Sequence, residues 1–287
     1  MSARLRIPAF ALAAGMMLAA SLILPATVAA DALTPESGGS PNADEIDVLY
    51  KIVLGVGVAV FLGVCGTLVY SLMRFKTRRG GVAALTRGNV RLEVGWTLAA
   101  TVIVVGLSVL TLVKLPAISD PSVTEPGGAQ VNVGGSLRAS VDEPRPEGGR
   151  NVRIDVVGQQ YLWRYDYPNG ASSYHEMVVP VGTTVLLDIS SADVAHSWWI
   201  PKLGGKFDAI PGYTSRTWFR IPRPGIYRGQ CAELCGQNHA DMSAQVRALP
   251  VAQYRAWVAR QSRLVEEAQQ ALARTRANTP PTNRTIR

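Results

Sequence analysis

Five side chains that commonly bind soft metal ions lie close together in the last third of the sequence. Cys231 and Cys235 are followed by His239 and Met242, and His196 lies upstream. Thiolate and imidazole ligands together select copper or zinc, and a thioether ligand points toward copper. A mononuclear blue-copper site uses a single cysteine, so the second thiolate is surplus for one ion. Two thiolates can instead bridge two copper ions while each ion keeps one histidine.

The same residues have more ordinary explanations. A C-x-x-x-C pair near a histidine is often a zinc or redox site, and a single methionine usually packs in a core. A thioredoxin-like copper chaperone also carries such a pair, but its βαβ pattern is absent, and it would not carry a ligating histidine four residues later. Only three cysteines occur and no C-x-x-C-H is present, which excludes a disulfide framework and a covalently attached haem. The five residues together therefore favour copper.

The distribution of charge excludes a nucleic-acid-binding surface on the part of the chain that carries these residues. The formal net charge is +8, but 94–250 contains thirteen basic and thirteen acidic residues. The excess of positive charge lies in 1–30, 74–93 and 251–287 instead. A domain that binds nucleic acid would concentrate basic residues on its own surface.

Two long apolar stretches predict helices that cross a membrane. The uncharged segments 52–73 and 94–113 are each long enough to span about 30 Å of hydrocarbon. The loop between them, 74–91, is strongly basic, and the positive-inside rule places such a loop in the cytoplasm. The hairpin is expected over 48–115, and everything after it is then external. The basic residues of the loop are Arg74, Lys76, Arg78, Arg79, Arg87 and Arg91.

The amino terminus has the pattern of a secretory signal peptide over 1–30. Two arginines precede an apolar run over 7–24, and the small residues 28–30 form a cleavage site. The alternative is an uncleaved membrane helix, although the apolar run is short for a span. The segment 31–47 that follows is expected to be short and external.

The external part of the chain is predicted to be an all-β sandwich or barrel over 150–250. It follows a Gly-, Pro- and Ser-rich segment, 116–149, that is expected to be a flexible linker. Helix-like spacing then predicts a helix over 251–276, within a carboxy-terminal segment 251–287 that ends in a disordered tail. Short β-branched runs separated by turn residues predict strands at 152–157, 161–167, 176–179, 184–189, 217–221 and 243–249.

Three motifs together resemble the family of cytochrome c oxidase subunit II, whose members carry a binuclear copper centre called CuA. The resemblance covers most of 45–250 and includes the two-helix hairpin. It implies an all-β cupredoxin domain, a Greek-key β-sandwich, preceded by a two-helix transmembrane hairpin. The motifs are Asp193-Val-Ala-His196-Ser-Trp198-Trp199-Ile-Pro201, Lys206-Phe-Asp208-Ala-Ile-Pro211-Gly212, and Gly229-Gln230-Cys231 through Met242.

The resemblance also implies which residues hold the two copper ions. Each ion has one histidine, and a methionine on one ion is matched by a backbone carbonyl on the other. The ligands are Cys231 and Cys235 as bridges, His196 with Met242 on one ion, and His239 with the Glu233 carbonyl on the other. The side chain of Glu233 is further expected to reach a magnesium or manganese ion at the border with subunit I.

The function implied by the resemblance is electron transfer within a cytochrome c oxidase. The chain would accept electrons from a soluble or membrane-bound cytochrome c and pass them to the haem of subunit I, which reduces oxygen to water. Subunit I and subunit III are the implied partners, in a bacterial cell membrane with the copper domain outside. The alternatives are a nitrous-oxide-reductase type of CuA domain, a quinol oxidase subunit II that lacks copper ligands, and a membrane-tethered copper-binding or delivery protein.

The aromatic stretch 158–165 departs from the family pattern G-x-Q-W-x-W-x-Y, in which the first tryptophan receives the electron from cytochrome c. Tyr161 stands at that position here. Because alternate strand residues share a face, Tyr161, Trp163 and Tyr165 are expected to line up. We hypothesise that Tyr161 is the surface entry point and that Trp163 packs beneath it toward the copper. The alternative is that these aromatics simply pack together as one face of the sandwich.

Three carboxylates have expected roles outside the copper ligands. Glu93 begins the second span and is either an interfacial carboxylate that reaches water or, as the resemblance implies, the entrance of a proton pathway in subunit I. Asp166 and Asp193 match carboxylates that steer a basic cytochrome in this family. Since 150–250 holds ten basic and eight acidic residues, steering is expected to be weaker, or the donor less basic, than is usual.

Overall fold

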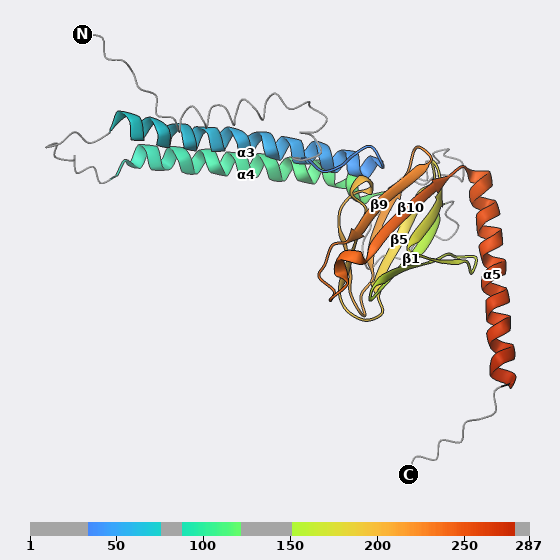
Figure 1. Ribbon diagram of the computed structural model, residues 1–287. Coiled ribbons are helices and arrows are strands. Elements are labelled where there is room, and N and C mark those ends of the chain that lie inside the picture. Colours follow the sequence, from blue (N-terminus) through green and yellow to red (C-terminus); the bar gives the residue numbers. More distant parts are fainter. Residues whose placement is uncertain (1–33, 76–87, 122–150, 279–287) are drawn as a thin grey trace, which may run out of the picture.

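The computed structural model describes residues 34–75, 88–121 and 151–278 (Figure 1). The expected signal peptide, most of the basic loop, most of the linker and the expected disordered tail lie outside the described residues. Within them, two long helices lead into a β-sandwich, and a third long helix follows the last strand.

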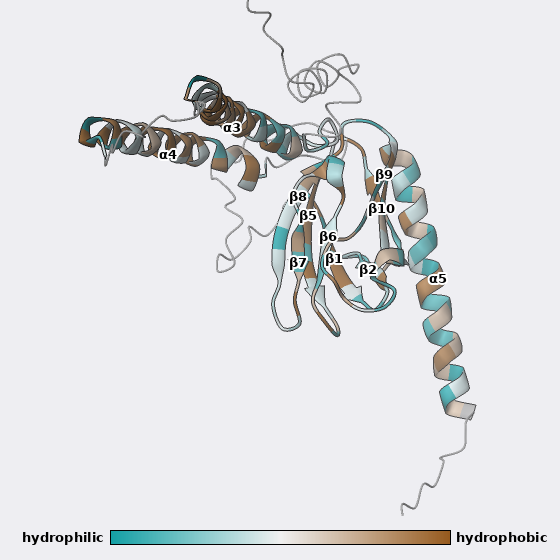
Figure 2. Ribbon diagram, turned by 60° about the vertical axis from the view of Figure 1, so that its left-hand side comes forward, coloured by the Kyte–Doolittle hydropathy of each residue, from teal (hydrophilic) through white to brown (hydrophobic). Residues whose placement is uncertain are grey.

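The first two helices form an antiparallel hairpin that is apolar along most of its length (Figure 2). Helix α3 spans Pro41–Arg74 and α4 spans Val90–Ser119. Both are long and apolar enough to cross a membrane, with a mean hydropathy of 2.5 and 2.3 over their most apolar stretches. No described part of the chain buries those stretches, as lipid-facing helices require. Lys114 Nζ and Glu45 Oε2, 2.7 Å apart, join the two helices at their sandwich end.

Both helices extend beyond the segments that the sequence predicts. Helix α3 begins at Pro41, inside the expected external stretch, and α4 continues through Pro116 to Ser119, inside the expected linker. Each helix is therefore longer than its predicted membrane-spanning stretch. Proline suits the first turn of a helix because its missing N–H has no partner there, and near the end of α4 it removes a single backbone hydrogen bond. Contacts with the sandwich stabilise both extensions.

Within the described part of the chain, ten strands form the two five-stranded sheets of the sandwich. The first sheet has the order β3-β2-β1-β5-β8 and the second the order β4-β10-β9-β6-β7. Each contains one parallel pair, β1 with β5 and β4 with β10, and is otherwise antiparallel. The predicted β-sandwich after a two-helix hairpin is thus confirmed. The strands are β1 (Val152–Gln159), β2 (Leu162–Asp166), β3 (Ser172–Tyr174), β4 (Glu176–Pro180), β5 (Thr184–Ser191), β6 (His196–Trp199), β7 (Phe207–Ala209), β8 (Ser215–Arg220), β9 (Gly225–Cys231) and β10 (Ser243–Leu249).

Four of these strands are not predicted by the sequence pattern, whereas all six expected strands are present with ends shifted by at most two residues. The unpredicted strands are β3, β6, β7 and β9. Strands β3 and β7 have only three residues each, and β6 has four. Strand β9 is mostly exposed and contains two glycines, so it lacks an apolar alternation. Strands β6 and β9 matter most, because each carries a candidate metal ligand.

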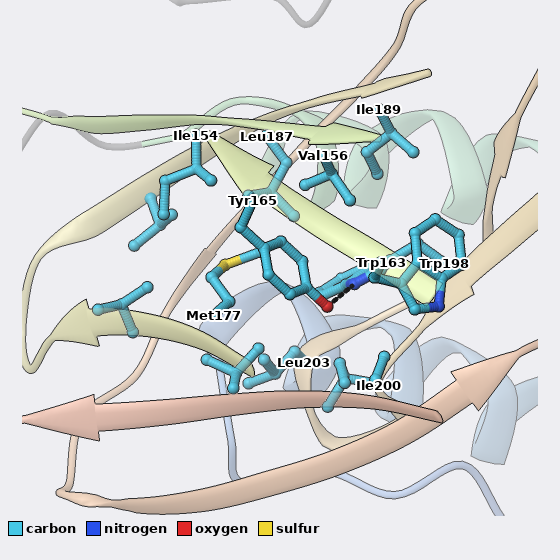
Figure 3. Close-up of a cluster of buried hydrophobic side chains, with 14 of the residues drawn as sticks. Ile154, Val156, Trp163, Tyr165, Met177, Leu187, Ile189, Trp198, Ile200 and Leu203 are labelled. Carbon is cyan, nitrogen blue, oxygen red and sulfur yellow. Dashed lines mark hydrogen bonds between the residues drawn. The ribbon is translucent and has the colours of Figure 1, made fainter. Parts of the chain in front are cut away.

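Large side chains from both sheets fill the space between them (Figure 3). Trp163 and Tyr165 of β2, Met177 of β4 and Trp198 of β6 are all at most 2% exposed. Tyr165 Oη accepts a hydrogen bond from Trp198 Nε1 at 3.4 Å, which connects the two sheets through the core. The alternation of β2 therefore places Trp163 and Tyr165 on its buried face.

Specific hydrogen bonds attach the helical hairpin to the sandwich. The Asn42 side-chain amide, 2% exposed, donates to the carbonyl oxygens of Leu203 at 3.3 Å and Trp218 at 2.9 Å. Trp218 Nε1 in turn donates to the Ile118 carbonyl at 2.9 Å, near the end of α4. Both helices are therefore tied to the same region of the sandwich.

The third helix covers one edge of the sandwich, where it contacts β3 of the first sheet and β4 of the second. Helix α5 spans Val251–Asn278, in agreement with the predicted helix. Trp257 packs edge-to-face on Tyr167 with 5.2 Å between ring centroids, and Gln261 Nε2 donates to the Ser172 carbonyl at 2.7 Å. Beyond these contacts the helix projects past the sandwich (Figure 1).

Replacing Asn42 with alanine should weaken the attachment of the hairpin to the sandwich. The substitution deprives the Leu203 and Trp218 carbonyls of their donor, and an unsatisfied buried polar group costs about 1–3 kcal/mol. Thermal unfolding of the detergent-solubilised full chain, followed by tryptophan fluorescence, should therefore show a lower midpoint. The exposed substitution Gln269→Ala is the control and should leave the midpoint in place. Equal midpoints for both variants would contradict the role of Asn42.

Candidate metal centre

Two strands of the second sheet place the first two candidate ligands. His196 begins β6 and Cys231 ends β9, and these strands are paired through Trp198 and Cys231. His196 is 0% exposed and Cys231 is 2% exposed. Strand β1 passes so close that a Cβ atom on Gly158 would lie 3.0 Å from the His196 ring. A glycine at this position leaves room for the imidazole.

The remaining candidate ligands lie on the loop 232–242, which connects β9 to β10. The Cys231 N–H donates to the Met242 carbonyl at 2.8 Å and closes this loop at its base. The Ala232 N–H donates to the Ser197 carbonyl at 2.8 Å and ties the loop to β6. A short 3-10 turn, η2 (His239–Asp241), carries the second histidine. The loop is thus fixed to both ligand-bearing strands.

The strands and the loop bring the sulfur and nitrogen atoms into one cluster. The Sγ atoms of Cys231 and Cys235 are 3.9 Å apart. His196 Nδ1 lies 3.9 Å from Cys231 Sγ, and His239 Nδ1 lies 3.6 Å from Cys235 Sγ. Met242 Sδ lies 3.8 Å from Cys235 Sγ. One imidazole therefore flanks each thiol.

Glu233 joins the cluster through its backbone. Its carbonyl oxygen lies 3.3 Å from Cys231 Sγ, whereas its side chain is exposed. The next residue, Leu234, is 78% exposed. The two predicted uses of Glu233 are compatible, because the carbonyl faces the cluster and the side chain is free to reach another group.

The chemistry of this donor set fits copper. Burial, with a contribution from the neighbouring Cys231 sulfur, raises the pKa of the Cys235 thiol to about 11. A thiol with this pKa is protonated at neutral pH, so a bound cation is needed to hold it as a thiolate. Both thiols lie within 4.8 Å of the His196 imidazole, and the Met242 thioether favours copper over zinc.

Asp193 orients the buried imidazole of His196. Its Oδ1 atom accepts a hydrogen bond from His196 Nε2 at 2.9 Å, which leaves Nδ1 directed at the sulfurs. The carboxyl also accepts hydrogen bonds from the N–H groups of Gln160 at 2.8 Å and Val194 at 2.6 Å. Desolvation opposes ionisation of Asp193, but these hydrogen bonds outweigh it and hold the pKa of the carboxyl below its usual range. Carboxylates support metal-ligating histidines in this way in many proteins.

The two predicted electron-entry residues lie beside the cluster, but not on one strand face. Strand β2 begins at Leu162, so Tyr161 lies in the turn before it rather than in line with Trp163. Tyr161 is half-buried, and its Oη atom accepts a hydrogen bond from the Gln237 N–H at 3.1 Å. The Trp163 ring is 0% exposed and meets the His196 ring edge-to-face, with 5.9 Å between centroids. The expected alignment was wrong for Tyr161, because the chain turns before β2.

Glu93 lies at the other end of the molecule from the cluster. It is in the first turn of α4, whereas Ile118 near the end of α4 contacts the sandwich (Figure 1). At 1.5 Å per residue, the helix separates these two positions by roughly 38 Å. The structure therefore does not bring Glu93 together with the metal centre.

Gln160 and Gly236 are site residues that had no predicted role, although Gln160 is the glutamine of the G-x-Q-W pattern and Gly236 lies within the motif that ends at Met242. Gln160 Nε2 donates to the Cys235 carbonyl at 2.7 Å, and Gly236 lies directly against the Gln160 and Tyr161 side chains. The contact between Asp193 and His196 could have been inferred from their D-x-x-H spacing. No such local signal links Gln160 to the cysteine loop.

Comparison with known proteins connects the hairpin and the sandwich to one family. A family model described as the transmembrane domain of cytochrome c oxidase subunit II matches residues 30–113, and one described as its periplasmic domain matches 171–249. Cytochrome c oxidase subunit 2 of Synechocystis is 32% identical over 77% of this chain and 73% of its own length. The protein of the same name from Alkalihalophilus pseudofirmus is 32% identical over 81% of this chain, which spans 64% of that relative.

Among solved structures, the periplasmic domain of subunit II of cytochrome oxidase from Bradyrhizobium japonicum is 31% identical, with a TM-score of 0.39. The match covers 42% of this chain and 98% of that one. Cytochrome c oxidase subunit 2 of Cereibacter sphaeroides is 29% identical over 78% of this chain and 80% of its own length. The two family models and the identity to the Synechocystis protein show that the chain belongs to the cytochrome c oxidase subunit II family.

Proposed function

We propose that this chain is the electron-transfer subunit of a haem-copper cytochrome c oxidase. It accepts electrons from cytochrome c and passes them to the haem of subunit I, which reduces oxygen to water. The observation that carries the proposal is the cluster of two thiols, two imidazoles and a thioether, with the two sulfurs 3.9 Å apart. The two apolar helices suit a membrane-embedded partner better than the soluble propeller of a nitrous oxide reductase.

The chain contributes rigid donors to the centre. A bound copper pair supplies a site that takes up and releases one electron with little nuclear rearrangement. His196 and Met242 are 0% exposed, and Asp193 holds the imidazole of His196 in one orientation. Met242 and the Glu233 carbonyl act as weak ligands that tune the potential. The residues proposed to hold the two copper ions are His196, Cys231, the Glu233 carbonyl, Cys235, His239 and Met242.

Electrons are proposed to enter through Tyr161 and Trp163. Tyr161 is partly exposed beside the cysteine loop, and the buried Trp163 ring lies against His196. The carboxylates expected to steer the donor are already engaged, since Asp166 pairs with Arg164 at 2.9 Å and Asp193 with His196. We therefore expect a cytochrome donor that is less basic than is usual, or one that is weakly steered.

The partners and orientation follow from the same proposal. Subunit I is expected to pack against the hairpin, with subunit III nearby, in a bacterial membrane that has the copper domain on its external side. The exposed Glu233 side chain is proposed to reach a magnesium or manganese ion at the border with subunit I. Glu93, at the far end of the hairpin, is proposed to lie at the entrance of a proton pathway.

The purified full chain should bind two copper ions and turn purple. Cys231→Ser or Cys235→Ser should abolish the mixed-valence spectrum, whereas Cys65→Ser in the first span should leave it intact. Met242→Leu should keep both ions but shift the potential, because a thioether would be a weak ligand that contributes little affinity. Elemental analysis, paramagnetic resonance and redox titration measure these outcomes. A blue protein with one copper, or preferential zinc loading from a copper-containing medium, would refute the proposal.

Replacing Tyr161 with leucine should slow copper reduction by the native cytochrome c but not by a small artificial reductant. Tyr161→Phe is the matched control, since it keeps the ring and removes only the Oη contact with Gln237. It should retain the cytochrome rate if the ring is the entry point. Stopped-flow absorbance measures both reactions. Equal rates for wild type and Tyr161→Leu with both donors would rule out the entry role.

A cysteine introduced at Gly80, in the basic loop, should be protected from a membrane-impermeant thiol reagent added to the external side of intact cells. Ser37→Cys is the control, because Ser37 is exposed in the segment that precedes α3 at the sandwich end of the hairpin. That cysteine should react, because the positive-inside rule places the two positions on opposite sides of the membrane. External labelling of Gly80→Cys would reverse the proposed orientation.

A further inference from the structure

The turn between β1 and β2 lies directly on the loop that carries Cys235. Gln160 Nε2 donates to the Cys235 carbonyl at 2.7 Å, and Tyr161 Oη accepts from the Gln237 N–H at 3.1 Å. Two consecutive residues of the turn thus contact two positions of the loop. The segments that meet here are 75 residues apart in the sequence.

The same turn also reaches the residue that orients the other half of the centre. The Gln160 N–H donates to Asp193 Oδ2 at 2.8 Å, while Asp193 Oδ1 accepts from His196 Nε2 at 2.9 Å. Gln160 therefore connects the support of His196 to the loop of Cys235. One residue makes both connections, one through its backbone and the other through its side chain.

The loop is shaped to accept this turn. A Cβ atom on Gly236 would lie 2.4 Å from Tyr161 Oη and 3.0 Å from Gln160 Nε2. Gly236 also has a φ of +136°, a conformation that residues with a side chain rarely adopt. A larger residue would have to displace the Tyr161 and Gln160 side chains that contact the loop. The close approach therefore depends on a glycine beside Cys235.

This connection matters because the two halves of the centre, each a cysteine with a histidine, are held by different kinds of structure. His196 and Cys231 belong to paired strands, whereas Cys235 and His239 lie on the loop outside the ladder. A shift of the loop would change the 3.9 Å separation of the two sulfurs. The turn is placed to prevent that shift.

We infer that Gln160 is a positioning residue that locks the Cys235 loop to the support of His196 and so fixes the spacing of the two halves of the copper centre. The inference rests on the proposed function for its consequence, since the locked spacing serves a copper pair. Gln160 donates hydrogen bonds to the Cys235 carbonyl and the Asp193 carboxylate and acts through these two residues. Loss of residues that support metal ligands typically lowers metal affinity 10–100-fold. Gln160 is exposed, so water can replace its hydrogen bond to the Cys235 carbonyl. We therefore expect a loss of copper affinity at the lower end of this range, about tenfold.

The decisive variant is Gln160→Met, which keeps the length of the side chain and removes its donor. In the copper-loaded full chain in detergent, transfer of copper to a chelator should be about tenfold faster than in wild type. The copper hyperfine pattern in paramagnetic resonance should also change, because the sulfur geometry relaxes. Gln269→Met, the same substitution at an exposed position on α5, should match wild type in both measurements. A wild-type rate and pattern in Gln160→Met would overturn the inference.

A second measurement on the metal-free chain separates this inference from the proposed function. Amide hydrogen exchange should speed up in the loop 232–242 of Gln160→Met while strand β5 keeps its protection. Unchanged exchange in the loop, or equal loss of protection throughout the sandwich, would overturn the positioning role. The copper content of the wild type tests the proposed function on its own. If that content is not two ions per chain, the exchange result still decides whether Gln160 locks the loop.

Discussion

Two buried sulfur atoms 3.9 Å apart are the constraint on which the rest of this structure depends. Burial raises the pKa of the Cys235 thiol to about 11, and two thiolates side by side would repel each other. The sandwich holds them together by anchoring Cys231 in a β ladder and closing the loop from Cys231 to the Met242 carbonyl. An imidazole beside each sulfur then completes a donor set that a soft cation stabilises. The contacts that stabilise the folded sandwich thus also hold these donor atoms close together.

The same sandwich is also held at a defined position relative to the hairpin. Asn42 at the start of α3 and Ile118 at the end of α4 both bond to the region of Trp218. These contacts involve the buried Trp218 carbonyl and the partly buried Ile118 carbonyl, so separating the parts would leave polar groups without partners. An electron-transfer centre needs a fixed distance to its acceptor. A hairpin that moved freely relative to the sandwich would not keep that distance fixed. The attachment seen here is compatible with the proposed electron-transfer role.

The carboxylates around the centre bind neighbouring groups of the same domain more than they contribute charge to its surface. Asp193 is engaged by His196 and by two backbone N–H groups, and Asp166 is paired with Arg164. Carboxylates engaged in this way contribute less to the attraction of a basic protein. The external domain carries ten basic and eight acidic residues over 150–250, which gives no strong negative field. The main effect of these carboxylates is therefore that Asp193 holds the His196 imidazole in a fixed orientation.

The sequence by itself determined the two apolar helices and the all-β character of the domain that follows them, and it predicted the candidate metal ligands. The helices and strands are local properties, because hydropathy and residue periodicity depend on neighbouring residues. The candidate ligands were instead predicted from their chemistry, since His196 lies 35 residues before Cys231. Only the tertiary structure decided that α3 begins at Pro41, that Tyr161 leaves the strand face, and that Gln160 meets Cys235. Each depends on which distant segments pack together, and the energy of such contacts outweighs local preference. No pattern within a short window encodes a meeting between residues 75 positions apart.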